Sequence, residues 1–167
     1  MPDTIDKHRD KLVAPYKPAA KSASVLESAK KLARLILESE ELLLKHRKKM
    51  LKEVLWLISE VDGKYTTRYR SAEVVRLARD KPCCDERIQH EHVYPRAEVA
   101  DRLLRERKAL LRAPGELDKL LDQTVACVVT KVEHGKLKTG HGWARYTEVP
   151  VLDMSTTPPT LLQTGNG

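Results

Sequence analysis

The sequence contains no phenylalanine, and aromatic residues make up only 4% of its 167 positions. A hydrophobic core must therefore be built mainly from leucine, valine, isoleucine and alanine, which the hydrophobic content of 41% permits. Leucine and alanine favour helices more than strands. The sequence thus predicts a mainly helical α+β fold of about one domain.

Long hydrophobic runs and cysteine pairs are also missing. No apolar run could cross a bilayer, so no membrane partner is expected. The three cysteines are an odd number in a chain without a secretory signal, which favours a reducing, cytoplasmic setting. The adjacent Cys83 and Cys84 could supply half of a zinc site. Without any Cys-x-x-Cys spacing, loop thiols are the simpler interpretation.

Positive charge is in excess. The formal net charge is +7 and the isoelectric point is near 9.3, which favours a polyanionic partner such as nucleic acid, with DNA as the expected kind. Charges of both signs are mixed through the chain, so many of them are expected on solvated helix faces. Nothing in the sequence indicates an oligomeric state.

Four segments are expected along the chain. Residues 1–22, with three prolines and many charges, predict a flexible basic arm. Residues 23–80 predict a helical region that opens on a capping box, Ser24 to Glu27, and forms one long helix or two helices broken near His46. A short hairpin follows Asp62-Gly63, and Ser71 is expected to cap a last helix of this region. Residues 81–154 alternate strands and helices, and residues 155–167 predict a disordered tail.

Basic residues gather at three places that could contact phosphates. The densest cluster lies in the middle of the helical region, a second alternates with tyrosines in the predicted hairpin, and a single arginine follows the only Val-Tyr-Pro. Solvated faces would have the same composition, so both interpretations stay open. The candidate nucleic-acid-binding residues are Lys45, Arg47, Lys48, Lys49, Arg68, Arg70 and Arg96.

The stretch from Arg87 to Arg96 carries the strongest chemical signal, because it places a carboxylate between two histidines. In an extended strand, His90 and His92 point to one face and Glu91 to the other. A metal site that uses adjacent residues therefore needs the strand to end or bend at this point. Pro95 supplies such an end, since it cannot donate to a ladder.

A second stretch of the sequence could contribute to the same site as the two histidines and Glu91. The β-branched run from Val125 to Val129 predicts a buried strand, and Thr130 is a plausible N-cap for a short helix that contains Glu133 and His134. The expected order is strand, turn and a histidine on a helix. Between the two stretches, residues 96–121 are predicted to be helical packing elements.

Together these stretches resemble the HNH nucleases of the ββα-metal superfamily. Glu-His-Val-Tyr-Pro is similar to the Asp-His-Ile-x-Pro signature, and Val-Val-Thr-Lys-Val-Glu-His is similar to the closing strand and helix in colicin-type nuclease domains. The resemblance covers His90 to Lys138. It implies long N-terminal helices packed on a small ββα-metal-like strand pair plus helix, with residues 81–154 as the HNH-like ββα region and its helical insertion. The central Asn of the motif has no evident counterpart.

The resemblance also implies roles for individual residues. His92 would be the general base that activates water, and Glu91 and His134 would bind a divalent ion, Mg²⁺, Mn²⁺ or Zn²⁺. His90 is a further, weaker candidate ligand. Imidazole can accept a proton from water near neutral pH, and a divalent cation stabilises charge on a scissile phosphate.

Three functions are consistent with these features. The first is a metal-dependent HNH-like endonuclease that hydrolyses phosphodiester bonds. The second is a non-catalytic nucleic-acid-binding module on a degenerate nuclease scaffold, and the third is a helical protein-interaction domain whose histidines are structural. A structure that brings His92 and His134 to a common point would favour the first.

Overall fold

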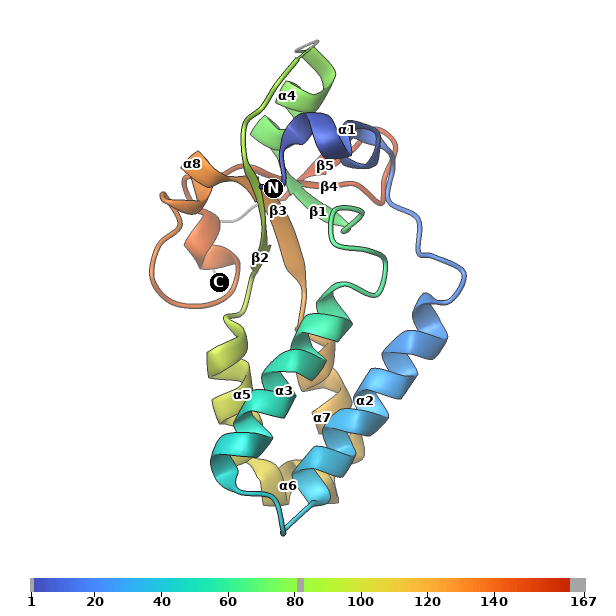
Figure 1. Ribbon diagram of the computed structural model, residues 1–167, viewed down its shortest axis with the longest axis vertical. Helices are drawn as coiled ribbons and strands as arrows, with labels where there is room; N and C mark the ends of the chain where they lie inside the picture. Colours follow the sequence, from blue (N-terminus) through green and yellow to red (C-terminus); the bar gives the residue numbers. More distant parts are fainter. Residues whose placement is uncertain (1, 81–82, 163–167) are drawn as a thin grey trace. The chain divides into compact units, whose positions relative to one another are not determined.

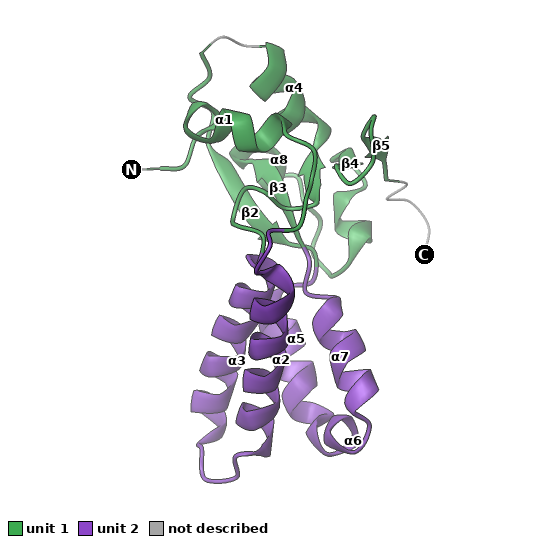
Figure 2. Ribbon diagram, turned by 90° about the vertical axis from the view of Figure 1, so that its right-hand side faces the viewer, with its two compact units in different colours: residues 1–18, 62–93, 126–167 green, residues 19–61, 94–125 purple. Residues whose placement is uncertain are grey.

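The computed structural model describes residues 2–80 and 83–162, and these form two compact units (Figure 2). One unit contains residues 1–18, 62–93 and 126–167, and the other contains residues 19–61 and 94–125. The first unit contains the sheet and the second is entirely helical (Figure 1). The predicted mainly helical α+β fold is confirmed.

The sheet of the first unit has five strands in the order β2-β3-β1-β4-β5. Strands β1 and β3 are parallel, and the other neighbouring pairs are antiparallel. A hydrophobic core that includes Ile5, Leu12, Val74 and Val128 lies between the sheet and helices α1 and α4. The elements of this unit are α1 (Ile5–Val13), β1 (Tyr69–Ser71), α4 (Ala72–Asp80), β2 (Ile88–His92), β3 (Ala126–Thr130), α8 (Lys131–His134), a 3-10 helix (Trp143–Tyr146), β4 (Val151–Asp153) and β5 (Thr160–Leu161).

The second unit is a bundle of five helices among the described residues. Its core is made almost entirely of leucine, isoleucine, valine and alanine, as the lack of phenylalanine requires. Residues 39–43 separate the first two helices, so the pattern expected as one long helix or two forms two. The helices are α2 (Ser22–Glu38), α3 (Leu44–Ser59), α5 (Arg96–Arg105), α6 (Arg107–Arg112) and α7 (Pro114–Asp122).

The segments expected from the sequence do not coincide with these units. Residues 1–22 were expected to form a flexible arm, but α1 is helical, with the side chains of Ile5 and Leu12 fully buried. These residues are seven positions apart, so they lie on one side of a helix. The expected hairpin is also absent from the described part of residues 62–80, where β1 pairs with β3 and β4 instead. Of the expected disordered tail, residues 155–162 include β5, and residues 163–167 lie outside the described part.

No helix in residues 2–80 or 83–162 has both the length and the apolar character that a membrane span requires.

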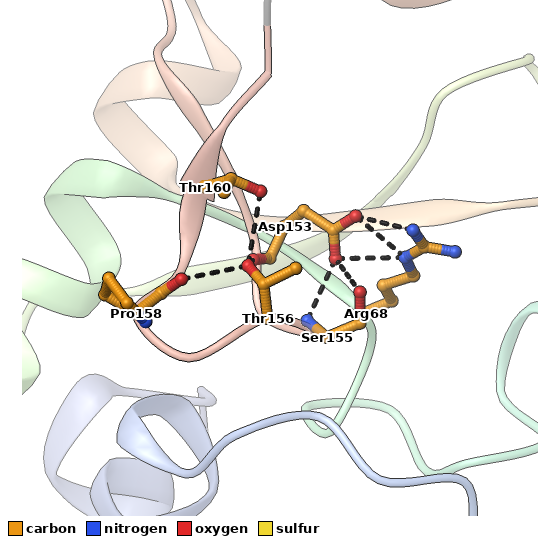
Figure 3. Close-up of polar contacts among 6 residues, drawn as sticks. All are labelled: Arg68, Asp153, Ser155, Thr156, Pro158 and Thr160. Atoms are coloured by element: carbon orange, nitrogen blue, oxygen red, sulfur yellow. Dashed lines mark hydrogen bonds and ion pairs between the residues drawn. The ribbon is translucent and has the colours of Figure 1, made fainter.

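A carboxylate at the end of β4 connects two segments of the sheet unit (Figure 3). Asp153 accepts hydrogen bonds from Nε and Nη2 of Arg68, at 3.0 and 2.6 Å, and from the amide and hydroxyl of Ser155. The Arg68 hydrogen bond is the largest influence, and it lowers the pKa of the Asp153 carboxyl to about 2 although burial opposes this.

Asp153 should therefore contribute to acid sensitivity. The pKa is lower in the folded than in the unfolded protein, so this stabilisation is present above about pH 4 and is lost as the pH falls towards about 2. Thermal denaturation across this range should show wild type losing its advantage over Asp153→Asn as the pH falls. An advantage that does not change with pH would contradict this prediction.

Candidate metal-binding site

Strand β2 presents its histidines and its glutamate on opposite faces. Ile88, His90 and His92 are buried, while Gln89 and Glu91 are only partly buried. The pairing with β3 sets this alternation, since Glu91 lies opposite Cys127 and the neighbouring His92 lies opposite Ala126. Residues directly opposite each other share a face of the sheet. Glu91 therefore projects from the face that also carries Cys127.

Helix α8 starts at the end of β3 through a capping box, which confirms Thr130 as its N-cap. The Glu133 amide donates to the Thr130 hydroxyl, and the Glu133 carboxylate accepts from the Thr130 amide, both at 3.0 Å. The Ser71 hydroxyl also donates to Glu133 at 2.6 Å. These buried contacts fix the start of a helix only four residues long, and so they position His134 at its end.

As a result, Glu91 and His134 meet. Oε2 of Glu91 lies 3.2 Å from Nδ1 of His134, although residues 94–125 separate the two strands in the sequence. The His134 side chain is 41% exposed, whereas that of Glu91 is 18% exposed. The pair thus has a carboxylate held inside the unit and an imidazole that reaches solvent.

Arg145, from the 3-10 helix, holds the other oxygen of the same carboxylate. Its Nη2 donates to Oε1 of Glu91 at 2.8 Å, and Nη1 donates to the His92 carbonyl at 2.8 Å. Nε donates to the Lys138 carbonyl at 3.2 Å. Sequence reasoning did not select Arg145, and no local motif marks it, because its contacts lie in segments far away along the chain.

Two glycines shape the loop that leads to Arg145. Gly140 and Gly142 have φ angles of 116° and 74°, which favour glycine, and the Gly142 amide donates to the Val93 carbonyl at 3.0 Å. The loop therefore meets the chain just after β2. His141 lies between the two glycines and is exposed.

The Glu91–His134 pair fits a divalent ion. Nδ1 of His134 is buried and makes no hydrogen bond within the described part of the chain, even though Oε2 of Glu91 is close. Metal-ligand bonds of about 2.0–2.2 Å place two neighbouring ligand atoms roughly 3 Å apart, so 3.2 Å suits two ligands of one ion. Arg145 would orient the carboxylate through its second oxygen, as hydrogen-bonding partners of metal ligands commonly do.

No third ligand completes the pair in residues 2–80 and 83–162, where no group of three or more His, Cys, Asp or Glu residues is arranged to hold a metal. Cys127 lies opposite Glu91, but burial raises the pKa of its thiol well above the ordinary value, so it stays protonated. Two protein ligands would leave several positions for water and substrate oxygens.

Comparison with known proteins does not place the chain in a family. No family model, curated protein or solved structure matches it. The functional assignment of the Glu91–His134 pair therefore rests on the geometry of the pair.

The structure does not bring His92 or His90 to this pair. Their rings lie on the other face of β2, with centroids 5.3 Å apart, and both side chains are buried. Strand β2 continues through His92 instead of ending or bending before it, because His92 still pairs with Ala126. Of the four residues predicted for the catalytic and metal site, the structure thus brings together Glu91 and His134 alone.

The two arginines predicted to bind nucleic acid in the sheet unit are engaged within the protein. Arg70 is 1% exposed and donates to the carbonyls of Thr67, Leu12 and Ala14, which is incompatible with phosphate binding. Arg68 binds Asp153 with two of its nitrogens, although half of its side chain is exposed. Arg70 was wrongly expected at the surface, since it alternates with tyrosines in a strand that lies in the middle of the sheet.

The predicted basic residues of the helical unit differ in availability. Arg96 stacks over Trp56 and donates to the Lys52 carbonyl, and Lys48 pairs with Asp101 at 2.6 Å. Arg47 donates through Nε to the Leu42 carbonyl. Lys45 and Lys49 are exposed and have no ion-pair partner in the described part of the chain. The last two are therefore the most accessible cations of the predicted set.

Proposed function

We propose that this protein is a metal-dependent HNH-like endonuclease that hydrolyses phosphodiester bonds, with DNA as its substrate. The observation that carries the proposal is the contact between Glu91 and His134, which the antiparallel strands β2 and β3 and the following helix α8 bring together. This order of strand, strand and helix is the one that the sequence resemblance implies. The helical insertion of residues 94–125 lengthens the connection without separating the two side chains.

The residues of the pair have complementary roles. Glu91 supplies negative charge for a divalent cation, and His134 supplies a neutral nitrogen ligand. A bound ion would lower the pKa of a coordinated water and neutralise charge on a phosphate. Arg145 holds the Glu91 carboxylate in place through Oε1 and leaves Oε2 directed at His134.

His92 has no proton-transfer role in this proposal. The prediction that it acts as the general base requires its imidazole beside Glu91 and His134, and the strand alternation directs it away from them. A general base must come within hydrogen-bonding reach of the attacking water. His134, His92 and His90 can therefore be distinguished by substitution.

The charge of the chain supports a polyanionic substrate. The net charge is +7, and Lys45 and Lys49 are exposed. Neutralisation of phosphates by lysine releases counterions, so binding to DNA should weaken as salt rises.

Plasmid cleavage by the purified protein tests the proposal. Supercoiled DNA should be nicked in Mg²⁺, Mn²⁺ or Zn²⁺ and remain intact in EDTA. Protein purified in parallel as the Glu91→Gln, His134→Ala double variant controls for contaminating nucleases. Nicking by the double variant equal to that of wild type, or no nicking in any of these metals, would contradict the proposal.

One observation favours a second candidate function, a non-catalytic DNA-binding module. The Arg145 guanidinium already balances the charge of Glu91 at 2.8 Å, which weakens the attraction of that carboxylate for a cation. This candidate predicts salt-sensitive DNA retention without cleavage.

Charge reversal at the accessible lysines would measure their part in DNA binding. Lys45→Glu with Lys49→Glu should lower DNA affinity and reduce the slope of log affinity against log salt by roughly 0.9 for each phosphate that the variant no longer neutralises. The matched control is Lys17→Glu with Lys119→Glu, which changes the net charge equally at two other exposed sites. An equal fall in affinity for both double variants would show that net charge alone controls binding.

A further inference from the structure

Exposed aliphatic side chains are concentrated on the hairpin formed by α2 and α3. Of the nine large hydrophobic residues that are exposed in the described part of the chain, seven lie in these two helices or at the N-cap of α3. Six of them, each 39–62% exposed, form what we call the α2–α3 stripe: Val25, Leu32, Leu35, Leu43, Met50 and Leu57. A contiguous apolar patch on a protein surface commonly marks an interaction site.

The spacing of these residues aligns them along the two helices. Leu43, Met50 and Leu57 recur every seven residues, and so do Val25 and Leu32, which places each set on one side of its helix. The helices run in opposite directions from the loop of residues 39–43. Leu32 and Met50 are equally far from the centre of this loop, as are Val25 and Leu57, so antiparallel packing places the members of each pair at similar heights along the hairpin.

Most of the basic cluster points away from the stripe. With 3.6 residues per turn, Lys45 and Lys48 lie on the opposite side of α3 from Met50 and Leu57, whereas Lys49 lies at the edge of the stripe. Nucleic acid bound at Lys45 and Lys48 would therefore leave the stripe in water. An apolar occupant would remove the stripe from water.

We propose that a second copy of this chain covers the α2–α3 stripe and forms a two-fold symmetric dimer. The heptad of α3 is symmetric about Met50. If α3 packs antiparallel to α3 of the second copy, Met50 lies against Met50 and each Leu43 lies against a Leu57. A two-fold interface must be self-complementary in this way, since each contact occurs twice.

Charges beside the stripe favour the same register. In that register Glu53 lies on the same flank of the contact as His46 and Lys49 of the second copy, and between them along the helix axis. Glu53 is exposed and has no ion-pair partner among the described residues of its own chain. Opposite charges at the edge of an apolar helix interface select partner and register. The α3 surface therefore carries both the apolar and the charged parts of a self-complementary contact.

Sedimentation equilibrium over a dilution series tests the dimer. Wild type should be dimeric at the concentrated end, and Met50→Glu with Leu57→Glu should raise the dimer dissociation constant by roughly a hundredfold or more, because it buries four carboxylates per dimer. Leu161→Glu, at a residue of β5 that is 62% exposed, is the control and should remain dimeric. Circular dichroism should show that both variants remain folded. A monomeric wild type would overturn the proposal, as would a dimer unaffected by the stripe variant.

A cysteine at the symmetry axis tests the register. In a Cys83→Ser background, which removes the exposed thiol, Met50→Cys should form a disulfide-linked dimer under copper–phenanthroline oxidation, since the two sulfurs would meet across the axis. Leu161→Cys should not. Failure of Met50→Cys to crosslink in a protein that remains dimeric would overturn the antiparallel α3 contact. This outcome is independent of nuclease activity.

Discussion

Replacing His134 with alanine is expected to reduce metal-dependent DNA cleavage by roughly a hundredfold or more, since it removes the imidazole nitrogen that contacts Glu91. Glu91→Gln should have a similar effect, because an amide keeps the shape of the side chain but loses the charge that attracts a cation. The measurement is the initial rate of plasmid nicking at saturating metal, with folding checked by circular dichroism.

Two further variants make this test specific. His92→Ala should retain most of the cleavage activity, because its ring lies on the opposite face of β2. Glu148→Gln removes an exposed carboxylate outside the pair and should behave like wild type. If His92→Ala abolished cleavage while His134→Ala did not, the general-base role predicted from the sequence would be correct and the proposed pair would be wrong.

Replacing Arg70 with leucine is expected to lower the free energy of unfolding by about 3 kcal/mol or more, which is a large part of a typical total of about 5–15 kcal/mol. Its guanidinium donates to the Leu12 and Ala14 carbonyls at 2.9 and 2.6 Å, and Nε donates to the Thr67 carbonyl at 3.2 Å. Leucine fills part of the volume but leaves these carbonyls without donors.

Chemical denaturation of wild type, Arg70→Leu and Arg76→Leu measures the effect. Arg76 is an exposed arginine whose partner Glu73 lies one helical turn away, so its loss should lower the free energy of unfolding far less than the loss of Arg70. A comparable change in the two variants would show that Arg70 does not hold the segment after α1. DNA affinity at low denaturant should not depend on Arg70 itself, since its side chain is buried.

Local signals in the sequence predicted several elements correctly. The β-branched run from Val125 gave β3, and Thr130 caps the helix that carries His134, as expected. Both features depend on residues close together in the chain. The capping box predicted at Ser24 did not form, because α2 begins two residues earlier, at Ser22, and the Ser24 hydroxyl donates to the Lys21 carbonyl instead.

The predictions that proved wrong concern residues whose surroundings are set by segments far away in the sequence. The face occupied by His92 depends on its pairing with Ala126, which lies beyond a long helical insertion. The burial of Arg70 depends on strands β3 and β4 on either side of it and on carbonyls from the chain after α1. Arg145 was missed for the same reason. Periodicity within one segment contains no information about such pairings.

Isothermal titration with Mn²⁺ is the most direct test of the proposed metal pair. Wild type should bind one ion per chain, with binding abolished in His134→Ala and in Glu91→Gln and retained in His92→Ala and Glu148→Gln. Binding that survives in both His134→Ala and Glu91→Gln, or no binding by wild type, would contradict the assignment of Glu91 and His134 as metal ligands.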